Sequence, residues 1–385
     1  SLQVIASRLH KPISYFLEET PPNTDPHISD KVFHMLTLGQ RLEANKLPQD
    51  ALEYYQQALN ELPADSHLLR ARILYLIART AAESQDDTLA IRRYREAADE
   101  FAAIQDLHSQ AKALILAGLL LLNVGDLEQA EDLLSDGYRT LDRSECDVYF
   151  WQIKAQSSLG FIYKQLNQPE RALSCYLESL EISIIHGVTV NYGEICREIG
   201  LINLNKKELA DAERYLTQAK HYYLATGNEQ NVARCSIYLA KAHLAQGNID
   251  TATRLAREGV EVLQLWAYPK EAYAAYAILG ETAEAARDYS NAMSYYKNAR
   301  EYAKVPEEIA SLELGIARIL RGQGSVADSI QHLLQLEEWI QTAAEPSLQA
   351  AFYSELAESY SILAESEKAQ KYMKKSLDIY RKLQR

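Results

Sequence analysis

The chain repeats one spacing of small residues about every forty positions along most of its 385 residues. Each copy has a Gly or Ala first, then an Ala or Ser twelve residues later, and usually a third small residue seven positions further on. The middle residues are Ala51, Ala90, Ala130, Ala172, Ala212, Ala252, Ala292, Ser329 and Ala369. Small residues at fixed places let two helices approach closely, and helix pairs repeated in this way stack into a solenoid.

The first small residue of each copy fixes the register of the repeats. These residues are Gly39, Ala78, Gly118, Gly160, Gly200, Ala240, Gly280, Ala317 and Ala357. The third position departs from the pattern only at Leu336, in the eighth copy. Nine concordant copies indicate one elongated array, although the length alone would allow two or three ordinary domains.

The composition favours helices throughout. Apolar residues make up 47% of the chain and charged residues 24%, as in ordinary soluble proteins. Proline falls near the expected helix ends, for example at Pro48, Pro169 and Pro269, where the first turn of a helix needs no amide donor. Neither strand-type alternation nor an Asn-Gly hairpin signal occurs. The sequence therefore predicts an all-α fold.

The copies resemble the tetratricopeptide repeat, whose pattern is Leu-Gly-x-x-Tyr followed by Ala-x-x-x-Phe. Gly160 and Tyr163 match the first half of this pattern, and Ala172 and Tyr176 match the second half. The known repeat has about 34 residues, so the longer spacing here predicts longer helices. The resemblance covers roughly residues 31–381. It implies a right-handed superhelical tetratricopeptide-repeat solenoid of about nine helix pairs.

The cysteines and the apolar segments indicate in which cellular compartment the protein resides. Cys146, Cys175, Cys196 and Cys235 form no CxxC motif and have no short metal-ligand spacing, which favours a reducing cytosol over a disulfide framework. The apolar run at 114–122 is too short to span a bilayer, and no cleavable leader opens the chain. We therefore expect a cytoplasmic protein with no membrane partner.

Residues 1–20 precede the array and carry no repeat signature. Leu2, Ile5 and Leu9 follow helical spacing, and Pro12 suits the start of a second short helix. These residues resemble the closing helices of the helix-turn-helix domain of phage-repressor-like bacterial regulators. The resemblance implies that this segment is the C-terminal remnant of a DNA-binding domain. The alternative is an amphipathic cap on the solenoid.

The remaining boundaries follow from composition. Residues 21–30 are rich in Pro, Asn and Asp and predict a linker, after which 31–385 form the tetratricopeptide-repeat array of nine repeats. A net charge of −13 disfavours nucleic-acid binding by the array itself, because phosphate contacts need a concentrated basic surface. Contact with DNA would therefore belong to the N-terminal domain.

Together these parts resemble the Rap, NprR and PlcR group of Gram-positive regulators, with NprR closest in architecture. The resemblance implies a quorum-sensing transcription regulator whose array binds a short signalling peptide and controls oligomerisation, as a homodimer or other homo-oligomer, and DNA binding. The alternative is a protein-interaction scaffold, or a Rap-like modulator of a response-regulator protein, without a DNA role.

The resemblance also implies where a peptide would lie, because the first helix of each tetratricopeptide pair lines the concave groove. The exposed stripe lies six and three residues before the first small residue, and one and four residues after it. In the fourth to sixth copies the stripe and its neighbours combine cations with apolar residues, as an extended peptide requires. The predicted peptide-binding residues are Lys154, Ser157, Phe161, Lys164, Arg197, Leu201, Asn205, Arg234, Tyr238 and Lys241.

A second interpretation of the stripe stays open. Lys and Arg on helices commonly serve only to solvate them, and apolar residues commonly pack between neighbouring helices. Peptide-sensing relatives use asparagines to hold the peptide backbone, whereas the stripe has none and Asn205 lies one residue beyond it. Further basic stripe residues, Arg72, Arg79, Arg318 and Arg321, could serve partner proteins or could simply be solvated.

No catalytic motif is recognisable, so we predict no enzyme, no catalytic residue, no metal site and no cofactor. The segment 322–327 matches GxGxxA, but a dinucleotide site needs a preceding strand, and here a helix precedes it. The nine histidines are scattered, without an HExxH motif, and neither a GxSxG elbow nor a Walker sequence occurs.

Overall fold

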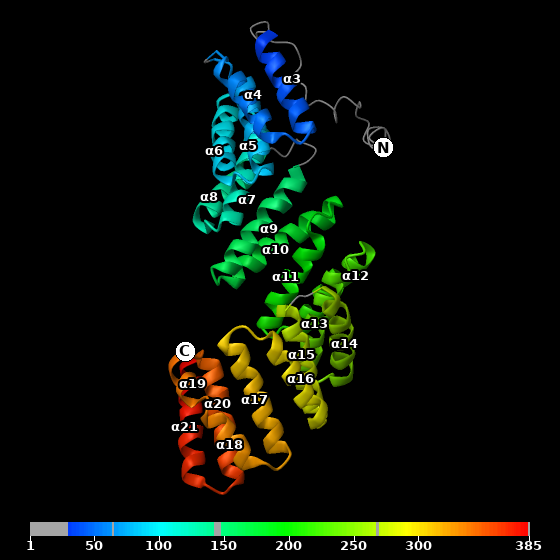
Figure 1. Ribbon diagram of the computed structural model, residues 1–385, viewed down its shortest axis with the longest axis vertical. Helices are drawn as coiled ribbons and strands as arrows, with labels where there is room; N and C mark the ends of the chain where they lie inside the picture. The colour runs from blue at the N-terminus through cyan, green and yellow to red at the C-terminus, as the bar shows by residue number, and fades with distance from the viewer. Residues whose placement is uncertain (1–29, 64, 142–147, 267–268, 384–385) are drawn as a thin grey trace. The chain divides into compact units, whose positions relative to one another are not determined.

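The computed structural model describes residues 30–63, 65–141, 148–266 and 269–383. All regular structure in these ranges is α-helical, and the helices follow one another in pairs (Figure 1). The helix-turn-helix remnant and the linker that the sequence predicts before residue 30 lie outside the described residues, so both stay predictions.

Contacts divide the chain into two compact units, the first running from Ser1 to Gln168. Its described helices are α3 (Asp30–Ala44), α4 (Pro48–Asn60), α5 (His67–Glu83), α6 (Asp87–Ala103), α7 (Leu107–Val124), α8 (Leu127–Thr140) and α9 (Val148–Gln165). Consecutive helices pack against each other around a core that includes Tyr55, Ile73 and Tyr94.

The second unit runs from Pro169 to Arg385. Its helices are α10 (Pro169–His186), α11 (Tyr192–Asn205), α12 (Leu209–Ala225), α13 (Glu229–Ala245), α14 (Ile249–Trp266), α15 (Pro269–Ala285), α16 (Tyr289–Tyr302), α17 (Pro306–Gly322), α18 (Val326–Leu334), α19 (Glu337–Ala343), α20 (Pro346–Ile362) and α21 (Ser366–Leu383). The first helices of successive repeats, α11, α13, α15, α17 and α20, contact each other in that order.

The prediction of an all-α solenoid is confirmed. In chain order the described helices correspond to the first and second helices of nine repeats. Within each unit, every second helix that precedes another repeat packs against the first helix of that repeat. This is the nearest-neighbour packing that defines a solenoid. A helix pair cannot bury its apolar face alone, so the stack of pairs supplies the continuous core.

Short turns that the sequence encodes locally separate the helices. In the third repeat, Gly125 ends α7 with a left-handed φ of 92°, which glycine adopts without strain because it has no Cβ. Asp126 then caps α8, because its carboxylate accepts a hydrogen bond from the backbone N–H of Gln129 at 3.2 Å. Asp86 and Asp288 cap α6 and α16 in the same way.

The small residues have the packing role that their spacing predicts. Ala51, Ala172 and Ala292 are 0% exposed. The ring of Tyr296 lies against Gly280 of its own repeat and Gly315 of the next, and a Cβ on Gly315 would come within 2.6 Å of the ring. The glycines therefore make room for one aromatic side chain that joins two repeats.

The eighth repeat differs from the others in its second helix. That helix is divided into α18, of nine residues, and α19, of seven residues. The break falls at Leu336, the one position where a large residue replaces the third small residue of the pattern. Leu336 packs instead against a core that contains Leu333 and Ile340.

The longest apolar run of the sequence lies in α7. This helix of 18 residues is the one in the described part of the chain that is long and apolar enough to cross a membrane by length and composition. It packs against α6 and α8, and its Ala113, Ile115 and Ala117 are 0% exposed. Its environment in the structure is therefore that of a core helix of the solenoid.

Candidate functional site

The predicted peptide-binding residues fall into both units. Arg197, Leu201 and Asn205 lie on α11, and Arg234, Tyr238 and Lys241 lie on α13, all within the second unit. Lys154, Ser157, Phe161 and Lys164 lie on α9, within the first unit.

Arg197 and Arg234 converge on one asparagine. A guanidinium N–H of Arg197 donates to Asn231 Oδ1 at 3.2 Å, and a guanidinium N–H of Arg234 donates to the same oxygen at 3.5 Å. Asn231 is on α13, one helical turn before the predicted stripe. The structure thus brings two predicted cations from consecutive repeats to one polar point.

Three carboxylates surround these two arginines. Arg197 forms ion pairs with Glu198 at 3.0 Å and with Glu194 at 3.6 Å. Arg234 forms an ion pair at 2.6 Å with Glu271, which comes from the seventh repeat. The network of Arg197, Asn231, Arg234 and Glu271 therefore joins three consecutive repeats.

The two arginines differ in their access to solvent. The side chain of Arg197 is 11% exposed, and that of Arg234 is 35% exposed. Burial is the largest single influence on Arg197 and acts to lower its pKa, but the charge and hydrogen bond of Glu198, together with Tyr223 and Glu194, outweigh it, so the pKa of Arg197 is raised. Arg197 is therefore a permanently charged residue inside the network, whereas the side chain of Arg234 is partly accessible to a ligand from solvent.

The remaining predicted residues of the second unit lie beside the network or farther along the face. Burial raises the pKa of Tyr238, whose hydroxyl also feels the opposing charges of Arg234 and Glu271. Leu201 is half-buried and Asn205 is exposed at the end of α11. Lys241 is exposed and has no ion pair within 4.0 Å among the described residues.

Beyond Lys241 the first helices carry charges of alternating sign. Glu281 is open to solvent on one side, yet desolvation by the surrounding protein raises its pKa, against the lowering effect of Arg318 and Lys241. Arg318 forms an ion pair with Glu284 at 2.6 Å. The cationic stripe residues from the sixth to the eighth repeat thus alternate with carboxylates from neighbouring repeats.

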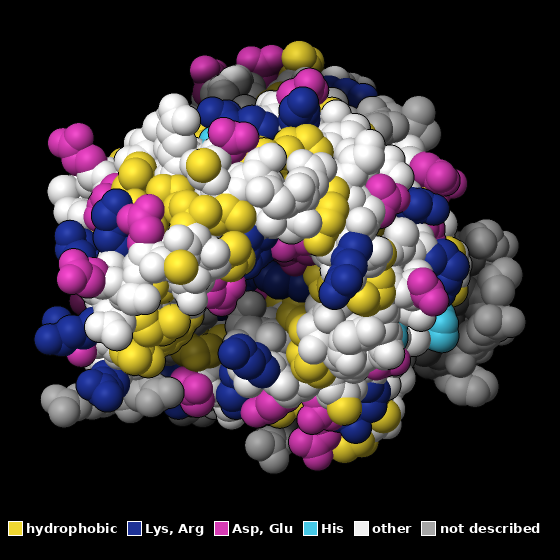
Figure 2. All heavy atoms as spheres, turned by 90° about the horizontal axis from the view of Figure 1, so that it is seen from below, with side chains coloured by type: hydrophobic (Ala, Val, Ile, Leu, Met, Phe, Trp, Pro, Cys, Tyr) yellow, Lys and Arg dark blue, Asp and Glu magenta, His cyan; other side chains and the backbone are white. Residues whose placement is uncertain are grey.

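Arg321 completes this series. It forms ion pairs with Glu355 at 3.0 Å and with Glu358 at 2.5 Å, both on the first helix of the ninth repeat. In Figure 2, Lys and Arg side chains likewise alternate with Asp and Glu over the face shown, with hydrophobic patches between them.

One three-residue cluster occurs in both units. Glu284 accepts a hydrogen bond from the Tyr296 hydroxyl at 2.8 Å and pairs with Arg318 of the next repeat. Glu43 accepts at 3.0 Å from the hydroxyl of Tyr55 and pairs with Arg79 of the next repeat at 3.1 Å. The sequence contained a signal for this cluster, because Glu, Tyr and Arg stand at the same three repeat positions in both copies.

On α9 the predicted residues form a cation and aromatic surface. Lys164 Nζ lies 5.7 Å from the centre of the Phe161 ring, and Lys154 Nζ lies 5.9 Å from that of Phe150. Such distances are typical of cation–π contacts. Ser157 is buried and its hydroxyl donates to the carbonyl oxygen of Lys154 at 3.3 Å.

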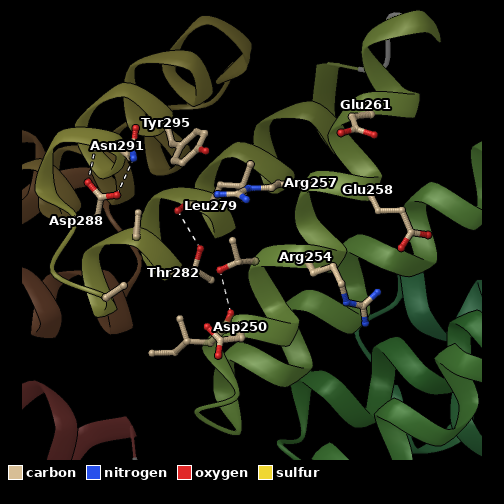
Figure 3. A pocket seen from close by; sticks show the side chains of 14 residues that line it. Asp250, Arg254, Arg257, Glu258, Glu261, Leu279, Thr282, Asp288, Asn291 and Tyr295 are labelled. Atoms are coloured by element: carbon tan, nitrogen blue, oxygen red, sulfur yellow. Dashed lines mark hydrogen bonds between the residues drawn. The ribbon is translucent and has the colours of Figure 1, made fainter.

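A hollow on another face of the second unit was not predicted. It has a volume of about 610 Å³ and lies between α14 and α16, with α15 beneath. Figure 3 shows Arg257 extending from α14 toward Tyr295 of α16. The carboxylate of Asp288 accepts a hydrogen bond from the side-chain amide of Asn291 at 2.6 Å. Four acidic side chains (Asp250, Glu258, Glu261 and Asp288) and two arginines (Arg254 and Arg257) line this hollow, so its charge does not favour an anionic ligand such as a peptide carboxylate.

Metal chemistry finds no support in the described part of the chain. No group of three or more His, Cys, Asp or Glu side chains there is placed to hold a metal ion. Burial raises the pKa of the Cys196 thiol to about 11 and that of the Cys235 thiol to about 12, so both thiols are neutral at physiological pH. Neither has the character of a nucleophile.

The fold and the repeated helix pairs define a tetratricopeptide repeat solenoid, a class of proteins that present extended recognition surfaces. A profile of the tetratricopeptide repeat family matches residues 153–183 and 350–383. Among curated proteins, the chain is similar to the regulatory protein AfsR of Streptomyces griseus, with 30% identity over 111 residues. This match covers 29% of the chain and spans 11% of the length of AfsR.

Two solved structures align with most of this chain. A signal transduction ATPase with numerous domains and a tetratricopeptide repeat sensor, from Pyrococcus horikoshii, aligns at 15% identity with a TM-score of 0.55. The alignment covers 95% of this chain and 54% of that one. The apo form of RapI aligns at 14% identity with a TM-score of 0.47, over 82% of this chain and 98% of that one. At 15% identity the likeness to the Pyrococcus horikoshii structure concerns the fold alone.

Proposed function

We propose that the chain is the recognition array of a regulatory protein and has no catalytic role of its own. The array binds an extended peptide on the first-helix face of the second unit, by which we mean the exposed side of α11, α13, α15, α17 and α20. The observation that carries the proposal is the convergence of Arg197 and Arg234 on Asn231, beside Glu271 of the next repeat.

The residues of this network have different roles in the proposal. Arg234 and Lys241 bind a carboxylate of the peptide, because both are accessible and Lys241 has no ion pair among the described residues. Asn231 pairs with the peptide backbone through its amide, as asparagines do in extended peptide grooves. Arg197 is a positioning residue that holds Asn231, and Leu201 and Tyr238 form the apolar wall.

The α9 surface is a separate part of the proposal. Lys154, Phe161 and Lys164 present cationic and aromatic groups on the first unit, and Ser157 lies buried behind them. These groups suit an acidic or aromatic segment of a peptide or of a partner protein.

We further propose that the whole protein is a cytoplasmic transcription regulator in which peptide binding controls oligomerisation and DNA binding. The N-terminal resemblance to a helix-turn-helix domain supports the DNA role, since the acidic array has no excess of cations for phosphates. Similarity to a regulatory protein over 111 residues supports the regulatory role. The alternative is a scaffold or modulator that binds a response-regulator protein.

A selection from a display library of short random peptides with free C-termini tests the peptide site. Immobilised wild-type protein should enrich one sequence family. Arg234→Ala should weaken binding of the enriched peptide by about tenfold to a hundredfold, because a charge-assisted hydrogen bond contributes about 1.5–3 kcal/mol. The measurement is isothermal titration calorimetry of each variant.

Arg254→Ala is the matched control, because Arg254 is an exposed arginine of α14 that lines the hollow away from the network. It should leave the affinity within about twofold, since it removes no contact with the peptide. Equal losses in both variants, or no enrichment by the wild-type protein, would contradict the proposal.

A further inference from the structure

Glu281 is an accessible carboxylate on the first-helix face of the second unit. It lies on α15, one residue after Gly280, the first small residue of the seventh repeat. Glu281 is exposed and forms no ion pair within 4.0 Å among the described residues. Glu284, one turn farther along α15, already accepts hydrogen bonds from Arg318 at 2.6 Å and 3.1 Å and from Tyr296 at 2.8 Å. Of these two carboxylates, Glu281 is therefore the one that can bind a group from outside the chain.

The protein around Glu281 solvates its charge poorly. Desolvation has the largest influence on this carboxyl and raises its pKa, whereas Arg318 and Lys241 lower the pKa and Glu284 raises it. The net shift is upward, so the two nearby cations do not fully offset the loss of water. A cation brought by a ligand would offset it further, because an opposite charge within about 4–6 Å favours the ionised carboxylate.

The residues that precede Glu281 on the same face of α15 are small. The stripe positions before it are Ala274 and Ala277, and both are half-buried. On α13 the same two positions carry the larger Arg234 and Ile237. Because α15 presents only methyl groups there, a side chain of a ligand has room to reach Glu281.

Glu281 lies one repeat away from Arg234 and Lys241, the cations of the proposed carboxylate site. Lys241 follows Ala240 in the sixth repeat as Glu281 follows Gly280 in the seventh. Their helices, α13 and α15, contact each other (Figure 1). Packed helices lie about 8–10 Å apart, and an extended chain advances about 3.3 Å per residue. An extended peptide that crosses from Lys241 to Glu281 therefore covers about three residues.

We propose that the first-helix face selects peptides with a Lys or Arg about three residues before the C-terminal carboxylate, and that Glu281 binds this basic side chain. Arg234 and Lys241 hold the carboxylate, and the basic side chain passes Ala277 to reach Glu281. The inference rests on the proposed peptide site and adds the direction of the peptide to it. The C-terminus lies at α13, and the residues before it run toward α15.

The probe is a display library of short random peptides with free C-termini. It is selected on the immobilised full chain and, in parallel, on the variant Glu281→Lys. The wild-type protein should enrich Lys or Arg at the third or fourth position from the C-terminus. The Glu281→Lys protein should enrich Asp or Glu at that position instead, because the charge of the binding residue is reversed.

Glu281→Gln tests the affinity, because it keeps the shape of the side chain and removes its charge. Calorimetry with the peptide that the wild-type protein enriches should show a loss of about threefold to tenfold. When Met replaces the basic residue of that peptide, Glu281→Gln should change the affinity by less than about twofold. Glu301→Gln is the matched control, because Glu301 is an exposed glutamate of the second helix α16. It should bind both peptides as the wild type does.

Three results would overturn the inference. Enrichment of a peptide family without a basic residue near the C-terminus would overturn it and leave the peptide site intact. No enrichment at all would remove the peptide site, and the role of Glu281 with it. An equal loss of affinity for both peptides in Glu281→Gln would show that this carboxylate supports the shape of the face and does not bind the basic side chain.

Discussion

At the scale of single residues, glycine and alanine set how closely the repeats stack. Gly280 and Gly315 both face the ring of Tyr296, from the first helices of consecutive repeats. The interior of a protein is close-packed, so an added side chain at such a point has nowhere to go. The stability of the array therefore depends on the absence of a side chain at Gly280 and Gly315.

Gly315→Leu should destabilise the second unit by about 1–3 kcal/mol, because the new side chain overlaps the Tyr296 ring. Ala210→Leu, at an exposed position of α12, should have an effect within about 0.5 kcal/mol. Urea denaturation followed by circular dichroism measures both. An unchanged midpoint for Gly315→Leu would mean that the helices are not as close as the structure shows.

A second residue-scale effect concerns pH. The hydrogen bond and charge of His332 hold the pKa of Glu313 below its usual value of 4.5, with a further contribution from Arg300. A carboxylate with a lowered pKa in the folded state stabilises that state above the unfolded pKa, and the contribution is lost as the pH falls through the folded value. Glu313 is therefore a stabilising residue at neutral pH.

Glu313→Gln should lower the unfolding free energy by about 1 kcal/mol at pH 7, and the difference from wild type should narrow as the pH falls below about 4.5. Urea melts over a series of pH values give the comparison. The exposed Glu301→Gln is the control and should show no such trend. A difference that stays constant with pH would show that Glu313 does not act through its charge.

At the scale of helices, the repeats are joined by polar contacts as well as by apolar packing. The cluster of Glu284, Tyr296 and Arg318 links the seventh repeat to the eighth, and that of Glu43, Tyr55 and Arg79 links the first to the second. In each, one carboxylate accepts from a core tyrosine and from an arginine of the next repeat. The same three residues therefore stabilise the contact between two repeats and fix how one repeat is aligned with the next.

A double-mutant cycle of Glu284→Gln and Arg318→Gln should give a coupling energy of about 0.5–3 kcal/mol, because the pair is partly buried and charge-assisted. The exposed pair Asp136 and Arg139, within one helix, should give less than about 1 kcal/mol. Chemical denaturation of the single and double variants measures both. Equal coupling in the two pairs would contradict the inter-repeat role.

The helices were predictable from the sequence, because small residues recur wherever two helices must cross. The split of the eighth second helix was signalled by Leu336, but the sequence did not show whether the helix would bend or break there. Glu194, one partner of Arg197, stands on the stripe, but the closer carboxylate partners of Arg234 and Arg197 could not be predicted from it. Glu271 and Glu198 lie off the stripe positions, and their distances depend on how far each repeat rotates against the next.

At the scale of the molecule, the proposed recognition face and the stacking of repeats use different helices. The first helices carry the polar network and the alternating charges, whereas the second helices carry the large residues that the next repeat covers. In our proposal the first-helix face of the second unit is therefore the side that receives an extended ligand.

The most direct test of the account is the position of the bound peptide. A photoreactive benzoylphenylalanine replaces Tyr238 in one variant and Tyr295, at the hollow between α14 and α16, in another. With the peptide enriched by the wild-type protein, irradiation should give a covalent adduct at position 238 and none at position 295. An adduct at position 295, or equal yields at the two positions, would contradict binding on the first-helix face.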